Sequence, residues 1–206
     1  MTVQESLTRA RTAFRIGDYG LAEQLILAVA QAKPRMAGLH NFLGSIYGRM
    51  GDHARAVREF KKAIELRKNY AEAYSNLGVA LKNMQRIEGA MAAFRKALRY
   101  APERADIHYN LGNVYKSSGR DEEAVAEFVK AQQLDPSFVP TYNNLGTSYE
   151  RLDRLEEAMA VYRKGLEEDF NQPNLHYNLG IALKRAGRLA EAQAEFEQTL
   201  RLKPEW

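Results

Sequence analysis

The segment AEAYSNLGVALKNMQRIEGAMAAFRKALRYAPER, Ala71–Arg104, decides the fold, because the rest of the chain repeats its pattern. Its fixed points are an aromatic residue, a Leu-Gly pair, two alanines flanking a phenylalanine, and a proline: Tyr74, Leu77, Gly78, Ala90, Phe94, Ala97 and Pro102. The pattern returns 34 residues later as His108, Leu111, Gly112, Ala124, Phe128, Ala131 and Pro136, and lies 34 residues earlier as His40, Leu43, Gly44, Ala56, Phe60 and Ala63. A fixed period of this length with two helical patterns inside it predicts a stacked array of helical hairpins.

The quoted residues resemble the tetratricopeptide repeat (TPR) family, and the resemblance covers almost the whole chain. Counting in frames of 34 residues gives six repeats: Val3–Met36, Ala37–Tyr70, Ala71–Arg104, Ala105–Phe138, Val139–Gln172 and Pro173–Trp206. The resemblance implies an all-α, right-handed superhelical solenoid formed by a single array over residues 3–206, which leaves no room for a separate catalytic domain. We expect the first and last repeats to act as caps, because a solenoid end lacks a neighbour and needs a polar outer face. Arg9 and Gln193 stand where the inner repeats carry apolar side chains.

Each repeat is predicted to contain a first helix, a turn and a second helix. A glycine recurs inside the first helix, as Gly44, Gly78, Gly112, Gly146 and Gly180. Glycine costs about 1 kcal/mol in a helix interior, so its recurrence indicates that another helix passes too closely for a side chain. Gln85 and Asp153 replace the glycine that ends the first helix, and Lys68 and Phe170 replace the proline after the second helix. We expect the first helices to end less cleanly at the former sites and the second helices to run on at the latter.

The composition excludes several classes of protein. The 206 residues are 45% apolar and 27% charged, which is typical of a folded chain, and the absence of cysteine excludes disulfides and thiolate metal sites. No segment approaches the ~18 apolar residues of a membrane span, and the N-terminus lacks the apolar core of a signal peptide, so we expect a cytoplasmic protein without membrane contact. The net charge of +4, with both signs mixed along the chain, mildly favours acidic partners without requiring nucleic acid.

The sequence predicts neither a catalytic centre nor a cofactor or metal. His40, His108 and His176 occupy the aromatic position of the first helix, where packing explains them. They lie two repeats apart, at ~8–10 Å per packed helix, so they cannot share a metal. Paired carboxylates such as Glu122 and Glu123 open a second helix, where acidic residues suit the helix dipole. Neither a phosphate-binding glycine loop nor a nucleophile–base motif is present.

A polar residue recurs at position 6 of the first helix, counted from the start of each frame. This position holds Asn76, Asn110, Asn144 and Asn178 in four successive repeats. Asparagine is a mediocre helix former, and its amide offers both a donor and an acceptor, so it can pair with the backbone of an extended peptide. The row resembles the asparagine ladder of the TPR superhelix in O-GlcNAc transferase, whose catalytic part has no counterpart here. The alternative is that these asparagines hold neighbouring helices together.

Tyrosines, a further asparagine and cations surround this row. The candidate peptide-binding residues are therefore Asn76, Asn110, Asn113, Asn144, Asn178, Tyr109, Tyr177, Lys82, Lys116, Lys184, Arg151 and Arg185. The cations lie near the C-terminal end of the first helix, so a solvated edge that complements the helix dipole is the alternative for them. The carboxylate clamp with which TPR chaperone adaptors hold an acidic C-terminal tail is absent. Asn113 and Asn144 match that clamp, but Tyr109, Asn174 and Asn178 stand at its other three places.

These patterns predict a protein-interaction module whose concave groove binds an extended, somewhat acidic peptide segment of a protein partner. Four asparagines spaced by ~10 Å, with ~3.3 Å per residue of extended chain, correspond to a segment of about ten residues. A scaffold that self-associates through its end repeats is the alternative. A helical-repeat nucleic-acid reader is less favoured because of the strict 34-residue period and the mixed charge. An enzyme is least favoured, because no set of residues converges.

Overall fold

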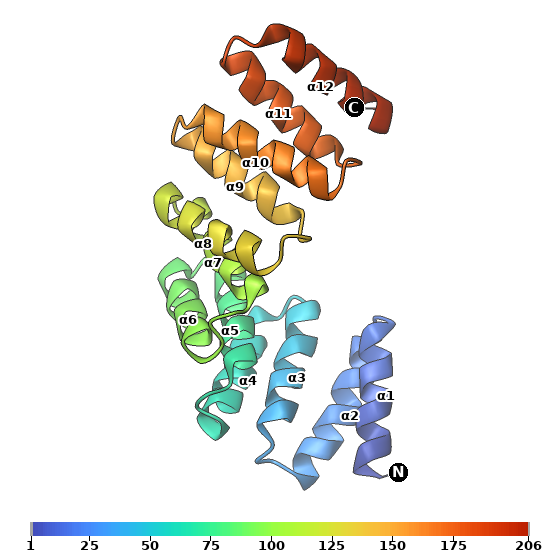
Figure 1. The fold of residues 1–206 in the computed structure, drawn as a ribbon. Coiled ribbons are helices and arrows are strands. Elements are labelled where there is room, and N and C mark those ends of the chain that lie inside the picture. Colours follow the sequence, from blue (N-terminus) through green and yellow to red (C-terminus); the bar gives the residue numbers. More distant parts are fainter. Residues whose placement is uncertain (1, 206) are drawn as a thin grey trace. The chain divides into compact units, whose positions relative to one another are not determined.

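A computed structural model describes residues 2–205 and shows an all-helical chain (Figure 1). Twelve helices follow one another in this part of the chain: α1 (Val3–Arg15), α2 (Tyr19–Ala32), α3 (Ala37–Arg49), α4 (His53–Leu66), α5 (Ala71–Asn83), α6 (Ile87–Tyr100), α7 (Ala105–Ser117), α8 (Asp121–Leu134), α9 (Pro140–Arg151), α10 (Leu155–Glu168), α11 (Pro173–Arg185) and α12 (Leu189–Leu202). Odd-numbered helices are the first and even-numbered helices the second of each predicted repeat. The all-α class and the six helical hairpins are therefore confirmed.

The chain divides into two compact units on either side of the bond between Pro102 and Glu103. Unit 1 holds α1–α6, coloured from blue to green in Figure 1, and unit 2 holds α7–α12, coloured from green to red. Within each unit a second helix packs on the first helix of its own repeat and also on the first helix of the next repeat. Each unit is thus a stack of three hairpins, and a single array over residues 3–206 stays a prediction.

The recurring glycine of the first helix faces an aromatic ring of the second helix in the same repeat. A Cβ atom added to Gly112 would lie 2.7 Å from Cε1 of Phe128, and one added to Gly78 would lie 2.8 Å from Cε1 of Phe94. Both distances are too short for a carbon–carbon contact, and both rings are fully buried. The close helix approach that the glycine pattern predicts is therefore the contact inside each hairpin.

The turn after the first helix contains a residue in the left-handed conformation in every repeat: a glycine in four repeats, and Gln85 or Asp153 in the other two. Gly119 has φ +76° and Gly187 has φ +77°, while Gln85 and Asp153 each have φ 59°. This conformation costs an L-residue roughly 1–2 kcal/mol. Helices α5 and α9 nevertheless end at the same repeat position as the others, so the expectation of less cleanly ended helices at these two turns is wrong. The turn geometry is set by the packing of the hairpin, which outweighs the local cost.

The second helices of the second and fifth repeats do not run on. Helix α4 ends at Leu66 and α10 at Glu168, the same repeat position at which α6 ends before Pro102. The backbone leaves α10 at Asp169 in an extended conformation, φ −147° and ψ 103°. His176 of the next helix then contacts the backbone carbonyl of Phe170, with Nε2 3.0 Å from the oxygen. The next hairpin therefore fixes this exit, and a proline is not needed to end the helix.

Truncation of two equivalent aromatic residues tests the hairpin contact. Phe128 is fully buried in unit 2, whereas Phe196 of the last repeat is half-buried. We expect Phe128→Ala to lower the free energy of unfolding by about 3–5 kcal/mol and Phe196→Ala to lower it by less, because part of its surface already meets water. Urea denaturation of both variants gives the two values. Equal losses, or a larger loss at Phe196, would contradict this account of the stack.

Candidate functional site

The predicted site residues lie on the first helices of the repeats, and those of unit 2 form the larger group. Within unit 2, α7 contacts α9 and α9 contacts α11, so their side chains can meet across repeats. The structure brings together Tyr109, Asn113, Lys116, Asn144 and Arg151, which come from α7 and α9. We call these five residues the unit 2 cluster.

Asn144 is the centre of the unit 2 cluster. Its Nδ2 donates to the hydroxyl oxygen of Tyr109 at 3.0 Å and to Oδ1 of Asn113 at 2.9 Å. Its Oδ1 accepts a hydrogen bond from Nζ of Lys116 at 3.0 Å. Both amide hydrogens are therefore used inside the protein, and what remains is one lone pair of the oxygen. Asn144 links α7 to α9, which is the helix-holding role that the sequence left open for it.

Lys116 is held in the same cluster by neutral acceptors. Its Nζ donates to Oδ1 of Asn144 and, at 2.6 Å, to Oγ1 of Thr147. The side chain is half-buried, and this burial lowers the pKa of Lys116 below the usual lysine value, with a further lowering from nearby Arg151 that Asp121 opposes. An ammonium group has three donors, so one N–H is left for a ligand. A desolvated cation that contacts only neutral acceptors favours an anionic ligand.

The predicted arginines are tied to the preceding repeat. Arg151 donates from Nη1 to the backbone carbonyl of Lys116 at 3.0 Å, and its Nη2 lies 3.2 Å from Oδ2 of Asp121. Arg185 pairs with Glu150 at 3.2 Å and with Asp153 at 2.9 Å. Both guanidinium groups thus connect successive hairpins, while more than two-fifths of each side chain stays exposed.

The other asparagines of the row make similar links. Asn178 donates to Oδ1 of Asn143 at 2.7 Å, and in unit 1 Asn76 donates to Oδ1 of Asn41 at 3.1 Å. Asn41 in turn donates to Oε1 of Glu72 at 2.9 Å. Asn110 is half-buried on α7. Position 6 is therefore not a freely exposed stripe, because these side chains are partly covered by the neighbouring first helix.

The remaining predicted residues lie apart from the unit 2 cluster. Tyr177 is 43% exposed and packs against Phe196, with the ring centroids 5.9 Å apart. Lys184 is exposed near the end of α11, and Lys82 is half-buried on α5 of unit 1. Sequence reasoning missed Thr147 and Asp121. Thr147 stands at the same repeat position as Asn113, so the 34-residue period was the signal that could have identified it.

The histidines of the first helices are packing residues. Nδ1 of His40, of His108 and of His176 lies 2.6 Å from a glutamate oxygen of the second helix in the same repeat: Glu59, Glu127 and Glu195 respectively. Each contact joins the two helices of one hairpin. Residues 2–205 contain no group of three His, Cys, Asp or Glu side chains that could hold a metal ion. Within the same residues, each helix is too short or too polar to cross a membrane.

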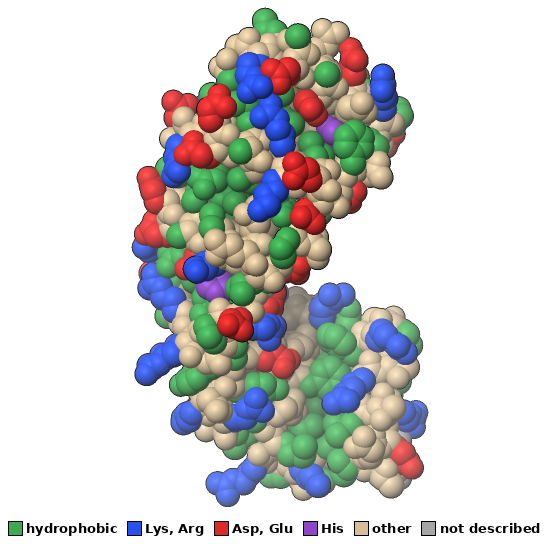
Figure 2. Space-filling model, viewed as in Figure 1, with side chains coloured by type: hydrophobic (Ala, Val, Ile, Leu, Met, Phe, Trp, Pro, Cys, Tyr) green, Lys and Arg blue, Asp and Glu red, His purple; other side chains and the backbone are tan. Residues whose placement is uncertain are grey.

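Basic and acidic residues are not evenly distributed between the two units, although both signs occur throughout the chain. Residues 1–102 hold 17 Lys and Arg against 8 Asp and Glu, a net charge of +9. Residues 103–206 hold 13 against 18, a net charge of −5. On the face shown in Figure 2, most of the red acidic side chains lie over unit 2, and blue basic ones predominate over unit 1. Unit 1 therefore carries a more positive electrostatic potential than the total of +4 suggests.

Solved structures with the same fold provide an independent comparison. PilF of Pseudomonas aeruginosa superposes with a TM-score of 0.84 at 18% identity, over 99% of this chain and 93% of that one. YrrB, described as a TPR protein with an unusual peptide-binding site, gives 0.75 at 20% identity, over 87% and 93%. A structure of MamA gives 0.72 at 29% identity, over 78% of this chain and 94% of that one. No curated protein matches the sequence.

Family models describe most of the sequence. The model described as TPR repeat matches residues 44–85, 83–119, 112–153 and 151–187, and the model described as tetratricopeptide repeat matches residues 173–206. These matches reach without a gap from residue 44 to residue 206, well over half of the chain. The match over residues 173–206 spans the last hairpin, which consists of α11 and α12. The chain therefore belongs to the tetratricopeptide repeat family.

Proposed function

We propose that this protein is a non-catalytic interaction scaffold that binds an extended acidic peptide segment of a partner protein along its first helices. The observation that carries the proposal is the unit 2 cluster, where a half-buried lysine contacts only neutral acceptors. A carboxylate of a bound peptide would complete its hydrogen bonds and neutralise its charge. The similar fold of YrrB, described as having a peptide-binding site, supports a peptide ligand.

The geometry revises how such a peptide would be held. Because Asn144 uses both amide hydrogens inside the protein, it acts by orienting Tyr109, Asn113 and Lys116 toward the ligand. The three first helices of unit 2 span two intervals of ~8–10 Å. At ~3.3 Å per extended residue they correspond to about six residues of peptide. We keep the other predicted contacts as part of the proposal: Asn76, Asn110, Asn178, Tyr177, Lys82, Lys184, Arg151 and Arg185.

Self-association is the second candidate function, and one observation favours it. A hollow of about 460 Å³ on the last repeat is lined by Tyr177, Phe196, Thr199 and Leu200. Leu200 is 51% exposed and Tyr177 is 43% exposed. Three of the four side chains around this hollow are aromatic or aliphatic, whereas Gln4, Glu5, Thr8 and Arg9 line the hollow on α1.

The Lys116 contact is tested with selected peptides. Random ten-residue peptides displayed on phage are selected on the wild-type protein, and the enriched sequences are synthesised and titrated by calorimetry. We expect enrichment of Asp and Glu, and an affinity that falls about tenfold in Lys116→Met, because a charge-assisted hydrogen bond is lost. Lys130→Met removes an exposed lysine as the matched control. Binding should also weaken as salt rises; enriched peptides that bind both variants and all salt concentrations alike would refute the proposal.

The role of Asn144 is tested by measuring folding and binding together. Asn144→Ala removes three hydrogen bonds between α7 and α9, so we expect the free energy of unfolding to fall by about 1–3 kcal/mol. Asn174→Ala changes an exposed asparagine of α11 and should leave stability unchanged. Unaltered stability in Asn144→Ala, combined with lost peptide binding, would show instead that the amide contacts the peptide directly.

The self-association alternative is tested at the apolar hollow. Sedimentation velocity over a hundredfold range of protein concentration should show association of the wild-type protein if two copies cover this surface. Leu200→Glu places a charge in the hollow and should then abolish association, while Leu66→Glu changes a leucine of similar exposure on α4 of unit 1 and serves as the control. A wild-type protein that stays monomeric throughout would rule out this candidate.

A further inference from the structure

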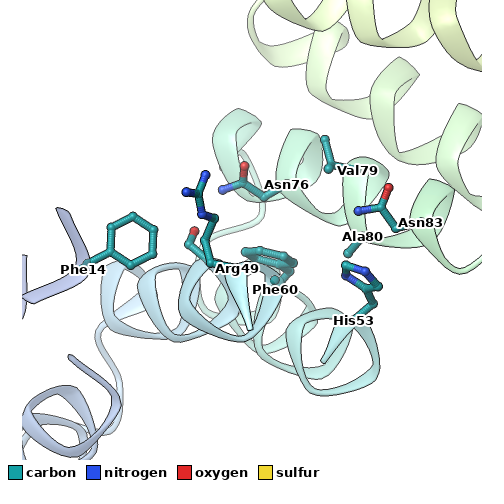
Figure 3. Close-up of a pocket in the computed structure, with 10 residues that line it drawn as sticks. Phe14, Arg49, His53, Phe60, Asn76, Val79, Ala80 and Asn83 are labelled. Atoms are coloured by element: carbon teal, nitrogen blue, oxygen red, sulfur yellow. The ribbon is translucent and has the colours of Figure 1, made fainter. Parts of the chain in front are cut away.

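Unit 1 contains a cavity that the predicted site residues do not explain. It has a volume of about 280 Å³ and lies between α3 and α5, beside α1 and α4 (Figure 3). Its wall includes Gly48 and Arg49 of α3, His53 of α4, and Asn76 and Asn83 of α5. The ring of Phe60 lies between the Arg49 end and the His53 end, as Figure 3 shows. The cavity therefore has an apolar middle and a polar group at each end.

The cavity exists because Gly48 stands at a position where other repeats carry a long side chain. The equivalent residues, 34 positions apart, are Lys82, Lys116, Glu150 and Lys184. In unit 2, Lys116 reaches across to Asn144 and Thr147 of the next first helix, and Glu150 reaches Arg185. A Cβ atom added to Gly48 would meet nothing within 4 Å. Glycine thus leaves open a space that a side chain of the protein fills in other repeats.

One end of the cavity contains an unpaired polar atom. Nδ1 of His53 is buried and makes no hydrogen bond with any group of residues 2–205. The equivalent residue in unit 2 is Asp121, which pairs with Arg151. In unit 1 the place of that arginine is taken by Asn83, which faces His53 across the cavity in Figure 3. A buried nitrogen without a partner costs about 1–3 kcal/mol, so a ligand that supplies a hydrogen bond is favoured here.

The other end of the cavity contains a cation that forms no ion pair with a carboxylate of residues 2–205. Nε of Arg49 donates to the hydroxyl oxygen of Tyr19 at 3.1 Å, and among residues 2–205 the guanidinium forms no ion pair. The equivalent arginines of unit 2 pair with acidic residues: Arg151 with Asp121, and Arg185 with Glu150 and Asp153. Arg49 therefore keeps its charge in a unit whose net charge is already +9, from 17 basic and 8 acidic residues. Because opposite charges attract, this end of the cavity favours an acidic group of a ligand.

We propose that this cavity binds one glutamate side chain of an acidic peptide. The carboxylate pairs with the guanidinium of Arg49, the two methylene groups lie over Phe60, and His53 exchanges a hydrogen bond with the peptide backbone. A backbone amide offers both a donor and an acceptor, so either tautomer of His53 is satisfied. The inference rests on the proposed function, because its occupant is a peptide segment, and it assigns to unit 1 a selectivity for glutamate.

The test uses variants of Gly48 that change volume and charge separately. The probe is a fluorescein-labelled peptide of ten glutamates with a C-terminal amide, titrated by fluorescence anisotropy. Gly48→Lys fills the cavity with the residue type that Lys116 provides at this position in unit 2, and it also adds a positive charge. We expect its affinity to fall about tenfold, whereas attraction to the basic surface alone would raise it. Gly48→Ala adds one methyl group in open space and should bind as the wild-type protein does.

A second pair of variants removes charge without changing the cavity wall elsewhere. Arg49→Gln should weaken binding about tenfold, and Arg58→Gln, which removes an exposed arginine of α4, should have a smaller effect. NMR signals of the His53 ring should shift on titration with the probe. Any of three results would overturn the inference: an unchanged or raised affinity in Gly48→Lys, equal effects of the two arginine variants, or His53 signals that do not shift on titration.

A third comparison distinguishes a glutamate side chain from a chain end as the occupant of the cavity. A peptide of ten glutamines with a free C-terminal carboxylate should not shift the His53 signals. If the glutamine peptide shifts these signals and the glutamate peptide does not, the cavity binds a chain end and the assignment to glutamate is wrong. If Lys116→Met weakens binding of the phage-selected peptides while Gly48→Lys has no effect on the probe, the proposed function stands and the cavity inference fails. If neither the selected peptides nor the probe bind, both fail.

Discussion

The contact between a glycine of the first helix and a ring of the second helix is the interaction on which every hairpin after the first depends. Gly44 faces the ring of Phe60, and Gly112 faces the ring of Phe128. A Cβ atom added to either glycine would lie too close to the ring for a carbon–carbon contact. The first repeat shows the compensation that this contact requires. There the small residue is Ala10 and its counterpart is the aliphatic Ile26, and both are fully buried. The methyl group of Ala10 occupies space that a glycine leaves open. The side chain of Ile26, which is smaller than an aromatic ring, compensates for it, so the two helices stay close.

Because the hairpin contact fixes the spacing of the helices, the residues between repeats are free to differ. Position 12 of the repeat is glycine in α3, lysine in α7 and glutamate in α9, with a different result each time. Gly48 leaves a cavity, Lys116 joins a neutral hydrogen-bonded cluster, and Glu150 pairs with Arg185 and accepts a hydrogen bond from Tyr162. The side chains at the contact between repeats can therefore change from one repeat to the next without disturbing the stack.

The charge distribution gives the two units net charges of opposite sign. The first 102 residues carry a net charge of +9, from 17 basic and 8 acidic residues, and the remainder carry −5, from 13 and 18. At physiological salt such fields act over about 8 Å, so the surface potential of each unit is set mainly by its own charges. In the acidic unit the half-buried Lys116 is a local exception, since its charge is directed into the unit 2 cluster.

The sequence by itself determined the twelve helices, the 34-residue period and the close helix approach at the recurring glycine, because all three follow from local helix preferences and from packing that recurs along the chain. It did not predict that the second helices of the second and fifth repeats end at Leu66 and Glu168; at the latter exit, His176 of the next hairpin contacts the carbonyl of Phe170. Only the tertiary structure decided that Asn144 spends its amide hydrogens on Tyr109 and Asn113, and that Arg151 pairs with Asp121. The cavity above Phe60 likewise required the structure. Such features depend on which side chains of two successive repeats meet, and a pattern within one repeat does not contain that information.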